Sequence, residues 1–282
     1  MKTTEDMHRE TMEYQTLHNG IRMPAVGFGT WDVRGTAGEN IIRMALDTGY
    51  RLIDTAQMYD NEEIVGKAVR ESGIPRSDIF VTTKLSRPCA TEEETARSIS
   101  SSLQRLGLDY VDLLLIHEPY RASVTMYRAM EKAYEQGLAR AIGISNFLPV
   151  PFQRLLQNCR IIPMVNQIES HVYHMQLDQK ELLEKAGTKM QAWASFTEGR
   201  KPIFADPLLN DIARRYGRTA AQIVLRYQLQ NGIMVIPKTA HRERMEENLN
   251  VFDFILQPED MRLIGTLDQG RSLFNWYGDD WM

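Results

Sequence analysis

Residues 92–117 read EEETARSISSSLQRLGLDYVDLLLIH, a charged segment of helix length followed by a short apolar run. The run at residues 111–116 is apolar apart from one aspartate, which is typical of a strand that is buried on both faces of a sheet. Such strands occur in parallel sheets, because crossover helices cover both faces. The stretch therefore predicts one helix–strand unit of an α/β fold.

The same alternation recurs along the whole chain. Apolar runs lie at residues 26–29, 52–53, 79–83, 111–116, 141–144, 163–168, 190–194 and 233–236. Helical patterns lie between them at residues 39–47, 62–71, 92–106, 124–136, 177–186 and 220–230. Eight units within about 220 residues, without a linker or a low-complexity segment, favour a closed (β/α)8 TIM barrel over an open sheet with a second domain.

Additional segments flank the eight units. Asn19-Gly20 lies between short β-rich segments at residues 14–17 and 21–26, and this pair suits the positive φ angles of a type I′ turn. The sequence therefore predicts an N-terminal β-hairpin. The helical pattern at residues 258–267 predicts an extra C-terminal helix.

We expect residues 1–282 to form a single barrel domain, with the barrel at about 14–268 and a C-terminal tail at 269–282. The tail is rich in aromatic residues, namely Phe274, Trp276, Tyr277 and Trp281. Large aromatic side chains at this density usually pack onto other parts of a protein. They cover either the flank of the barrel or the mouth of an active site, and the sequence leaves both alternatives open.

The composition restricts the class of partner. Hydrophobic residues make up 43% of the chain and charged residues 25%, as in an ordinary globular enzyme. The formal net charge of -4 argues against general binding to nucleic acid or acidic membranes, and no apolar run approaches the ~20 residues that span a bilayer. Because only Cys89 and Cys159 are present and no signal peptide is visible, we expect a cytoplasmic protein. Nothing in the sequence demands more than a monomer.

Polar or reactive side chains follow one predicted strand after another. The carboxyl ends of barrel strands meet at one face of the molecule, where barrel enzymes carry their catalytic groups. The side chains at these positions are Asp54, Tyr59, Lys84, His117, Ser145, Asn146, Gln167, Trp193, Lys238 and Thr239. Each has an ordinary explanation when taken alone, such as a helix cap or a core histidine. Together on one face, they predict an active site.

Three motifs in the chain resemble the signatures of the aldo-keto reductases, in the order found in that family. The first is GYRLIDTAQMYDNE at residues 49–62, and the second is LGLDYVDLLLIH at residues 106–117. The third is IPKT at residues 236–239, followed by Arg244 and the pair Glu247-Asn248. The likeness runs from about residue 14 to residue 268. It implies a TIM barrel that reduces small-molecule carbonyl compounds with NADPH.

The resemblance also implies a catalytic tetrad of Asp54, Tyr59, Lys84 and His117. Hydride transfer to a carbonyl places negative charge on its oxygen, which then needs a proton donor and stabilising groups. Tyr59 is the implied general acid, and a nearby Lys84 cation is expected to lower the pKa of its hydroxyl. Asp54 is expected to hold Lys84, and His117 to orient the substrate oxygen.

Residues for the cofactor and the substrate carry over from the same resemblance. Ser145, Asn146 and Gln167 are the implied contacts of the nicotinamide carboxamide, and Trp193 is the implied stacking partner of its ring. The implied contacts at the 2′-phosphate and adenine end are Lys238, Thr239, Arg244, Glu247 and Asn248. Thr30 and Trp31 lie where the first strand of the family meets cofactor and substrate. An arginine suits a phosphate because its planar fork can donate two hydrogen bonds.

The chain departs from the family pattern at two places. Glu118 follows the catalytic histidine where relatives often have tryptophan, so it is either a pocket residue that disfavours anionic substrates or a rim residue that faces water. Ala194 stands where relatives commonly have serine, and Thr197, Gly199 and Arg200 are candidates to replace the lost contact. The sequence does not rank these options.

The sequence also has to be considered for a metal site and for two alternative functions. His171 and His174 form a His-x-x-His pair, but no third ligand has a suitable spacing, and we expect no metal. A barrel aldolase with a Schiff base on Lys84 or Lys238 would explain a lysine at a strand end, but it would leave the other tetrad residues without a role. A protein that binds the nicotinamide cofactor as a redox sensor without catalysis is the second alternative.

Overall fold

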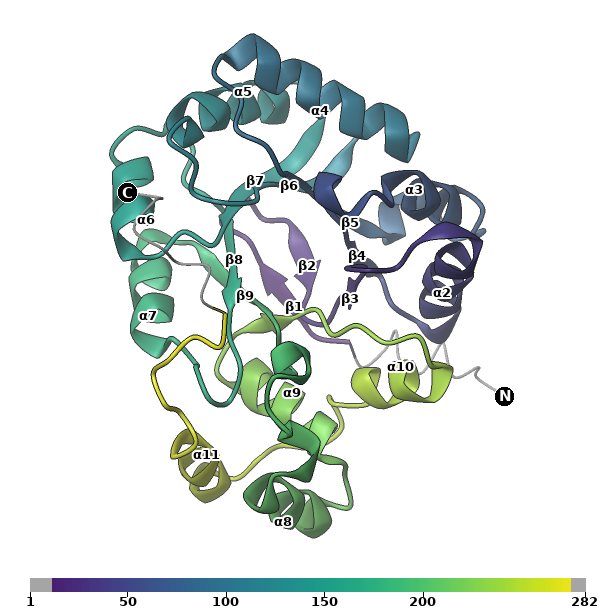
Figure 1. The fold of residues 1–282 in the computed structure, drawn as a ribbon, viewed down its shortest axis with the longest axis vertical. Coiled ribbons are helices and arrows are strands. Elements are labelled where there is room, and N and C mark those ends of the chain that lie inside the picture. The colour runs from purple at the N-terminus through teal and green to yellow at the C-terminus, as the bar shows by residue number, and fades with distance from the viewer. Residues whose placement is uncertain (1–11, 275–282) are drawn as a thin grey trace.

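The computed structural model describes residues 12–274, and eight parallel strands form its centre (Figure 1). Each strand pairs with the next one along the chain. Their bounds are β3 (Phe28–Gly29), β4 (Leu52–Asp54), β5 (Phe80–Leu85), β6 (Val111–Ile116), β7 (Ala139–Ser145), β8 (Val165–Glu169), β9 (Lys189–Trp193) and β10 (Met234–Val235). Each predicted apolar run overlaps one of these strands.

Backbone contacts between the first and the last strand close the sheet into a barrel. Val26 and Val235 form a parallel bridge just outside β3. The amide of Gly27 donates to the carbonyl of Val235 at 2.8 Å, and the amide of Val235 donates to the carbonyl of Ala25 at 2.9 Å. The predicted (β/α)8 barrel is therefore confirmed, and Figure 1 shows it along the barrel axis.

Helices surround the barrel (Figure 1). The α-helices are α2 (Gly35–Thr48), α3 (Glu62–Arg70), α4 (Glu92–Leu106), α5 (Ser123–Glu135), α6 (Pro149–Leu156), α7 (Leu177–Ala186), α8 (Pro207–Tyr216), α9 (Ala220–Gln230), α10 (Arg242–Leu249) and α11 (Pro258–Gly265). Short 3-10 helices are η1 (Gln57–Tyr59), η2 (Arg76–Asp78), η3 (Thr197–Gly199) and η4 (Ile203–Ala205). In the part of the chain described, no helix is both long enough and apolar enough to cross a membrane.

Local sequence signals explain where the longest helix begins and ends. The Thr91 hydroxyl accepts a hydrogen bond from the amide of Glu94 at the start of α4, and the first turn is acidic, which suits the positive end of the helix dipole. Gly107 ends α4 in the left-handed conformation with φ 60°. Gly66 of α3 packs against the C-terminal end of α4. A Cβ atom at position 66 would lie 1.7 Å from the Leu106 carbonyl oxygen. Only glycine permits this approach of α3 to α4.

The predicted N-terminal hairpin consists of β1 (Tyr14–Thr16) and β2 (Arg22–Pro24). The predicted type I′ turn is wrong, because Gly20 has a positive φ of 86° whereas Asn19 does not. The loop has three residues instead of two: the Leu17 amide donates to the Ile21 carbonyl, and the Gly20 amide donates to the Leu17 carbonyl, both at 2.8 Å. Gly20 therefore occupies the last position of a three-residue loop, where a positive φ angle is required.

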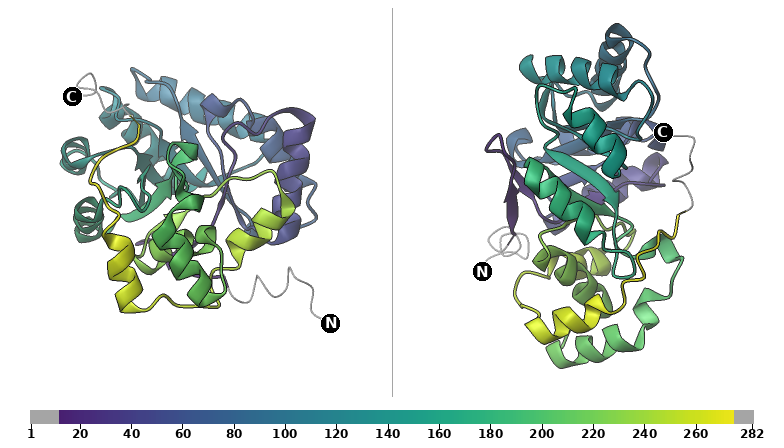
Figure 2. Two further views of the ribbon diagram at one scale, coloured as in Figure 1. Left: turned by 60° about the horizontal axis from the view of Figure 1, so that its bottom comes forward. Right: turned by 90° about the vertical axis from the view of Figure 1, so that its left-hand side faces the viewer.

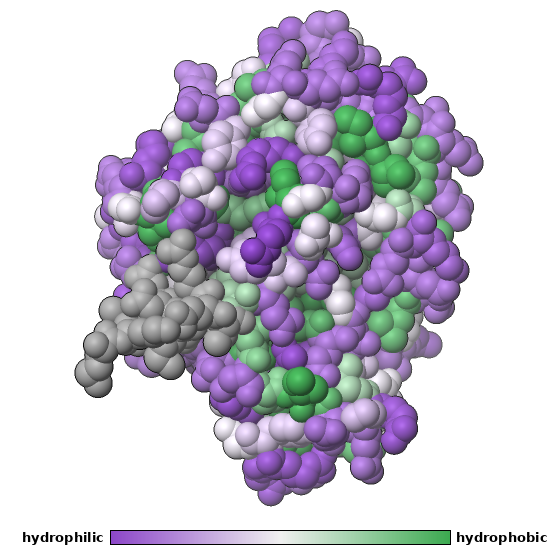
Figure 3. Space-filling view, turned by 180° about the vertical axis from the view of Figure 1, so that it is seen from behind, coloured by the Kyte–Doolittle hydropathy of each residue, from purple (hydrophilic) through white to green (hydrophobic). Residues whose placement is uncertain are grey.

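The hairpin covers the end of the barrel at which the strands begin. Leu17 and Met23 are buried in one cluster with strand residues such as Leu52, Leu113 and Leu115. Figure 2 (right) shows the hairpin and the segment that leads to Phe274 at opposite ends of the barrel. Figure 3 shows the hairpin end from outside, where hydrophobic residues occur in small groups among hydrophilic ones. The hairpin thus closes this end of the barrel with apolar side chains.

Candidate active site

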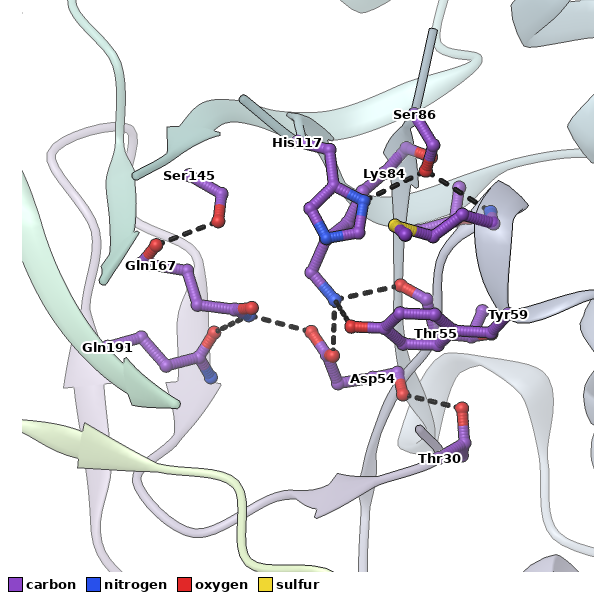
Figure 4. A network of polar contacts seen from close by, with 12 residues as sticks. Thr30, Asp54, Thr55, Tyr59, Lys84, Ser86, His117, Ser145, Gln167 and Gln191 are labelled. Carbon is purple, nitrogen blue, oxygen red and sulfur yellow. Dashed lines mark hydrogen bonds and ion pairs between the residues drawn. The ribbon is translucent and has the colours of Figure 1, made fainter. Parts of the chain in front are cut away.

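The ends of neighbouring strands bring the four tetrad residues together (Figure 4). Asp54 is the last residue of β4, and Lys84 is the penultimate residue of β5. His117 directly follows β6, and Tyr59 ends the 3-10 helix η1 that follows β4. Asp54, Lys84 and His117 are buried, whereas Tyr59 is half-buried. Parallel pairing of β4, β5 and β6 sets the spacing among them.

Lys84 lies at the centre of the tetrad. Its Nζ donates hydrogen bonds to Asp54 Oδ1 at 2.5 Å, to the Thr55 carbonyl oxygen at 3.0 Å and to the Tyr59 hydroxyl at 3.2 Å. The Lys84 and Asp54 side chains are 0% and 2% exposed, so this ion pair is removed from water. An ammonium has three donors, and all three are used here.

Burial dominates the acid–base properties of Tyr59. It raises the pKa of the Tyr59 hydroxyl above its ordinary value, and the nearby Lys84 charge offsets this only in part. The predicted net lowering of this pKa is therefore wrong. Burial alone would lower the pKa of Lys84, but Asp54 and Tyr59 outweigh it, so the net pKa of Lys84 is raised. Tyr59 thus keeps its proton at neutral pH, and Lys84 keeps its charge.

His117 completes the tetrad beside Tyr59. The two ring centroids are 5.8 Å apart in an edge-to-face arrangement. Burial, with a smaller contribution from the Lys84 charge, lowers the pKa of His117 to about 3. The imidazole is therefore neutral at physiological pH. Its Nδ1 lies 2.8 Å from the Ser86 hydroxyl oxygen.

A second network links the predicted nicotinamide residues to the tetrad. Gln167 Nε2 donates to Asp54 Oδ2 and to Gln191 Oε1, both at 2.8 Å. The Ser145 hydroxyl donates to the Gln167 carbonyl at 2.8 Å. Since β7, β8 and β9 pair in register, these side chains lie at one level of the barrel, next to Asp54 (Figure 4).

Asn146 connects Trp193 to Glu118. Its Oδ1 accepts a hydrogen bond from Trp193 Nε1 at 2.8 Å, and its Nδ2 donates to Glu118 Oε1 at 2.9 Å. Asn146 has a positive φ of 64°, a conformation that asparagine tolerates better than most residues. Glu118 is half-buried, and burial raises its pKa to about 7, offset in part by the Asn146 hydrogen bond.

Two residues that follow β3 border the same site. The Thr30 hydroxyl donates to the Asp54 carbonyl oxygen at 2.8 Å. The Trp31 ring meets Tyr59 edge to face, with centroids 5.0 Å apart. Trp31 is 45% exposed, so it stands at the edge of the site, between Tyr59 and solvent.

The start of the C-terminal tail is fixed beside the site. Glu169, buried at the end of β8, accepts hydrogen bonds from the Leu273 amide at 2.9 Å and from the Ser272 hydroxyl at 2.5 Å. Phe274 is fully buried and packs edge to face on Trp193, with centroids 4.8 Å apart. The tail residues Trp276, Tyr277 and Trp281 lie outside the described residues.

All three residues considered as replacements for a serine at position 194, Thr197, Gly199 and Arg200, lie in the loop after β9. Arg200 is engaged by the tail: its Nη1 donates to the Leu273 carbonyl at 3.1 Å, and its guanidinium lies 4.2 Å from the Phe274 ring centroid. The Thr197 hydroxyl donates to the Lys201 carbonyl oxygen at 3.2 Å. Ser195, in contrast, is buried with a hydroxyl that has no partner among residues 12–274. Ser195 was not among the residues predicted from the sequence.

The predicted phosphate and adenine residues form a separate group beyond β10. Lys238 and Arg244 are exposed, and neither forms an ion pair with any residue between 12 and 274. Glu247 Oε1 accepts a hydrogen bond from the Thr219 hydroxyl. Asn248 is buried and hydrogen-bonds to the side chain of Tyr50, while Thr239 is buried in the preceding loop. The structure brings none of these residues to the tetrad.

The predicted His-x-x-His pair belongs to a structural network. His171 Nε2 bonds to the buried Glu169 carboxylate at 3.0 Å, and the backbones of His171 and His174 pair with each other. Within the described range, no group of three or more His, Cys, Asp or Glu side chains is arranged to hold a metal ion.

Besides Ser195, three further residues at the site were not identified from the sequence. Ser86 contacts His117, Gln191 contacts Gln167, and Glu169 fixes the start of the tail. Gln191 and Glu169 are polar residues at strand positions, which is a signal that the sequence contains. Ser86 directly follows β5, as His117 follows β6, so its position in the sequence was a signal as well.

The chain is similar to known proteins over most of its length. The profile of the Aldo/keto reductase family matches residues 25–202 and 194–269. The 9,11-endoperoxide prostaglandin H2 reductase of Trypanosoma cruzi (strain CL Brener) is 40% identical over 261 residues, which cover 92% of each chain. The glyoxal reductase of Bacillus subtilis (strain 168) is 40% identical over 262 residues, 91% of this chain and 93% of that one.

A solved structure gives the same result. An aldo-keto reductase complexed with NADPH, of which a second structure is described as that of the silkworm, Bombyx mori, superposes with a TM-score of 0.85 at 33% identity, over 93% of this chain and 89% of that one. The chain therefore belongs to the aldo-keto reductase family.

Proposed function

We propose that this protein reduces aldehydes or ketones to alcohols with NADPH, as a cytoplasmic monomer, and that Tyr59 is the general acid. The observation that carries the proposal is the position of Lys84 Nζ, within hydrogen-bond distance of both Asp54 Oδ1 and the Tyr59 hydroxyl. Small aldehydes, α-dicarbonyl compounds and keto-sugars are the proposed substrates. The similarity to a glyoxal reductase favours the α-dicarbonyl class.

The tetrad can stabilise the negative charge that develops on a carbonyl oxygen. Bound NADPH would supply the hydride. Tyr59 donates its proton to the oxygen, and the phenolate that forms is stabilised by the Lys84 ammonium at 3.2 Å. Asp54 keeps this ammonium charged and in place. The neutral His117 ring donates a hydrogen bond that orients the carbonyl oxygen.

The donor groups of this chain fit the cofactor. Ser145 and Gln167 lie next to the tetrad, where they would hold the nicotinamide carboxamide, and Trp193 would stack on the ring. The buried Ser195 hydroxyl has no partner within residues 12–274, so it can donate to the pyrophosphate. Lys238 and Arg244 are exposed cations that would hold the 2′-phosphate, while Thr239, Glu247 and Asn248 would lie toward the adenine.

The structure argues against the two alternatives. A Schiff-base lysine must be neutral to attack a carbonyl, but the pKa of Lys84 is raised and its amine is ion-paired to Asp54. Lys238 is exposed and forms no hydrogen bond to a tetrad residue within the described range. A sensor without catalytic activity would not require the assembled tetrad.

The proposal is tested by following NADPH consumption with a panel of glyoxal, methylglyoxal, aromatic aldehydes and keto-sugars. We expect turnover with at least one of these classes, and the alcohol product identifies the reaction. Tight NADPH binding without turnover of any of them would support the sensor instead. Trapping of a substrate adduct by borohydride would support the lyase.

Replacing Arg244 with alanine should raise the KM for NADPH about tenfold, because the 2′-phosphate loses a charged hydrogen-bond donor. The KM for NADH should stay unchanged, since NADH lacks that phosphate. Arg262→Ala on α11 is the matched control, because Arg262 is also exposed. An equal rise for both cofactors would contradict the role assigned to Arg244.

Glu118 should make discrimination against anionic substrates depend on pH. Its pKa is raised to about 7, so the carboxyl is largely neutral at about pH 6 and largely charged at about pH 8. We expect kcat/KM for a carboxylated benzaldehyde, relative to benzaldehyde, to fall about threefold to tenfold over this range through like-charge repulsion. In Glu118→Gln the ratio should not change with pH. A wild-type ratio that is flat with pH would place Glu118 outside the substrate pocket.

A further inference from the structure

The Ser86 hydroxyl lies between two groups that compete for its single hydrogen. His117 Nδ1 is 2.8 Å from Ser86 Oγ, and the Lys84 carbonyl oxygen is 3.4 Å from it. Hydroxyl hydrogen bonds to oxygen are usually about 2.5–3.0 Å long. The contact with the imidazole is therefore the stronger one.

A third group already donates to the same oxygen. The Met58 amide donates to Ser86 Oγ at 3.2 Å. If His117 Nδ1 also carried a hydrogen, Oγ would receive two donors, and its own hydrogen would have only the distant Lys84 carbonyl. If Nδ1 is unprotonated, the serine hydrogen has a near acceptor and the amide keeps its partner. Hydrogen-bond satisfaction thus favours the second arrangement.

The backbone of Ser86 is fixed in turn. Its amide donates to Gln57 Oε1 at 3.1 Å, and Gln57 Nε2 donates to the Ser98 and Ser102 hydroxyls at 2.9 and 2.8 Å. These contacts join η1, which also carries Tyr59, to α4, so the backbone of Ser86 is held beside the ring by η1 and, through Gln57, by α4. Figure 4 shows the other ring nitrogen of His117 on the side that faces Asp54 and Tyr59.

We propose that Ser86 is a positioning residue that donates its hydroxyl hydrogen to His117 Nδ1 and so keeps the ring in the Nε2-protonated tautomer. In that tautomer the nitrogen that faces the site is a donor, which a carbonyl oxygen requires; in the opposite tautomer it would be an acceptor and would repel that oxygen. Burial keeps the imidazole neutral, so only one of its two ring nitrogens carries a hydrogen. The inference rests on the proposed function for the role of His117 in reduction.

Nitrogen NMR of the His117 ring measures the tautomer without reference to activity. In the wild-type enzyme we expect Nδ1 to be unprotonated and Nε2 to be protonated at neutral pH. Ser86→Ala should give a mixture of tautomers, and Ser86→Thr, which keeps the hydroxyl, should restore the wild-type spectrum. A protonated Nδ1 in the wild type would overturn the inference, even if Ser86→Ala fails to fold.

Kinetics supply the second readout. Ser86→Ala should lower kcat about fivefold, the factor that corresponds to one neutral hydrogen bond, with little change in the KM for NADPH. Ser86→Thr should restore kcat. Ser123→Ala is the matched control, because the Ser123 hydroxyl is buried without a partner within residues 12–274. An unchanged tautomer and an unchanged kcat in Ser86→Ala would refute the role of Ser86.

The two measurements separate the inference from the proposed function. A wild-type enzyme with the Nε2-protonated ring that turns over no carbonyl compound would refute the function and leave the tautomer assignment in place. Turnover of a carbonyl compound by an enzyme in which His117 Nδ1 is protonated would refute the tautomer assignment and support the proposed function.

Discussion

Tyr59→Phe is expected to lower kcat for carbonyl reduction by about 1,000-fold, because the variant lacks the proton donor while the rest of the tetrad stays in place. The phenyl ring can keep its contacts with Trp31 and His117, since these involve the ring and not the hydroxyl. The Kd for NADPH, measured by fluorescence titration, should therefore change little. Single-turnover kinetics should locate the loss in the chemical step.

Tyr127→Phe is the matched control for this experiment. Tyr127 is fully buried on α5, and its hydroxyl has no hydrogen-bond partner in the described part of the chain. Removal of that hydroxyl should leave kcat unchanged. A Tyr59→Phe enzyme that kept kcat within about tenfold of the wild type would show that another group donates the proton.

Lys84→Met is expected to destabilise the fold by about 3–5 kcal/mol at neutral pH, in addition to abolishing activity. The Asp54 carboxylate, 2% exposed, would lose the ammonium at 2.5 Å and remain buried as an uncompensated charge. Urea denaturation measures the free energy of unfolding.

Two further variants isolate the buried charge. The double variant Asp54→Asn/Lys84→Met should recover much of the lost stability and none of the activity, since it leaves neither ion buried. Lys185→Met is the surface control: Lys185 pairs with Glu181 in α7, but the two side chains are 71% and 66% exposed, so the effect should stay within about 1 kcal/mol. A double variant no more stable than Lys84→Met would indicate a packing defect instead.

The order of strands and the position of the tetrad could be predicted because both depend on local sequence. An apolar run such as residues 111–116 identifies a buried strand, and a reactive residue at its end, such as His117, lies at the common face of the barrel. Convergence of the strand ends then brings distant residues together. No knowledge of side-chain contacts is needed for this step.

Contacts that depend on register could not be predicted in the same way. Gln167 lies opposite Gln191 because β8 and β9 pair at this register, and spacing along the chain does not fix that choice. The turn at Gly20 shows the same limit, because Asn-Gly is compatible with a loop of two or three residues.

Three helices were also missed, each for a physical reason. The short α6 has two prolines in its first turn, Pro149 and Pro151, which interrupt a helical pattern in the sequence, and α10 is strongly charged, so its apolar stripe is weak. For α8 the signal was present: Asp206 caps the helix by accepting from the Leu208 and Leu209 amides, and Pro207 occupies the first position.

The bridge between Val26 and Val235 has a consequence for biosynthesis. A ribosome releases the first strand long before the last one, so the Val26 edge of the nascent sheet has no hydrogen-bond partner until β10 emerges. Ring closure then joins segments separated by most of the chain, which is a slow kind of contact to form. Translational arrest or proteolysis before Ile233 would leave a sheet with an unpaired edge that is prone to aggregate. A chaperone would therefore matter most late in synthesis, before β10 has emerged.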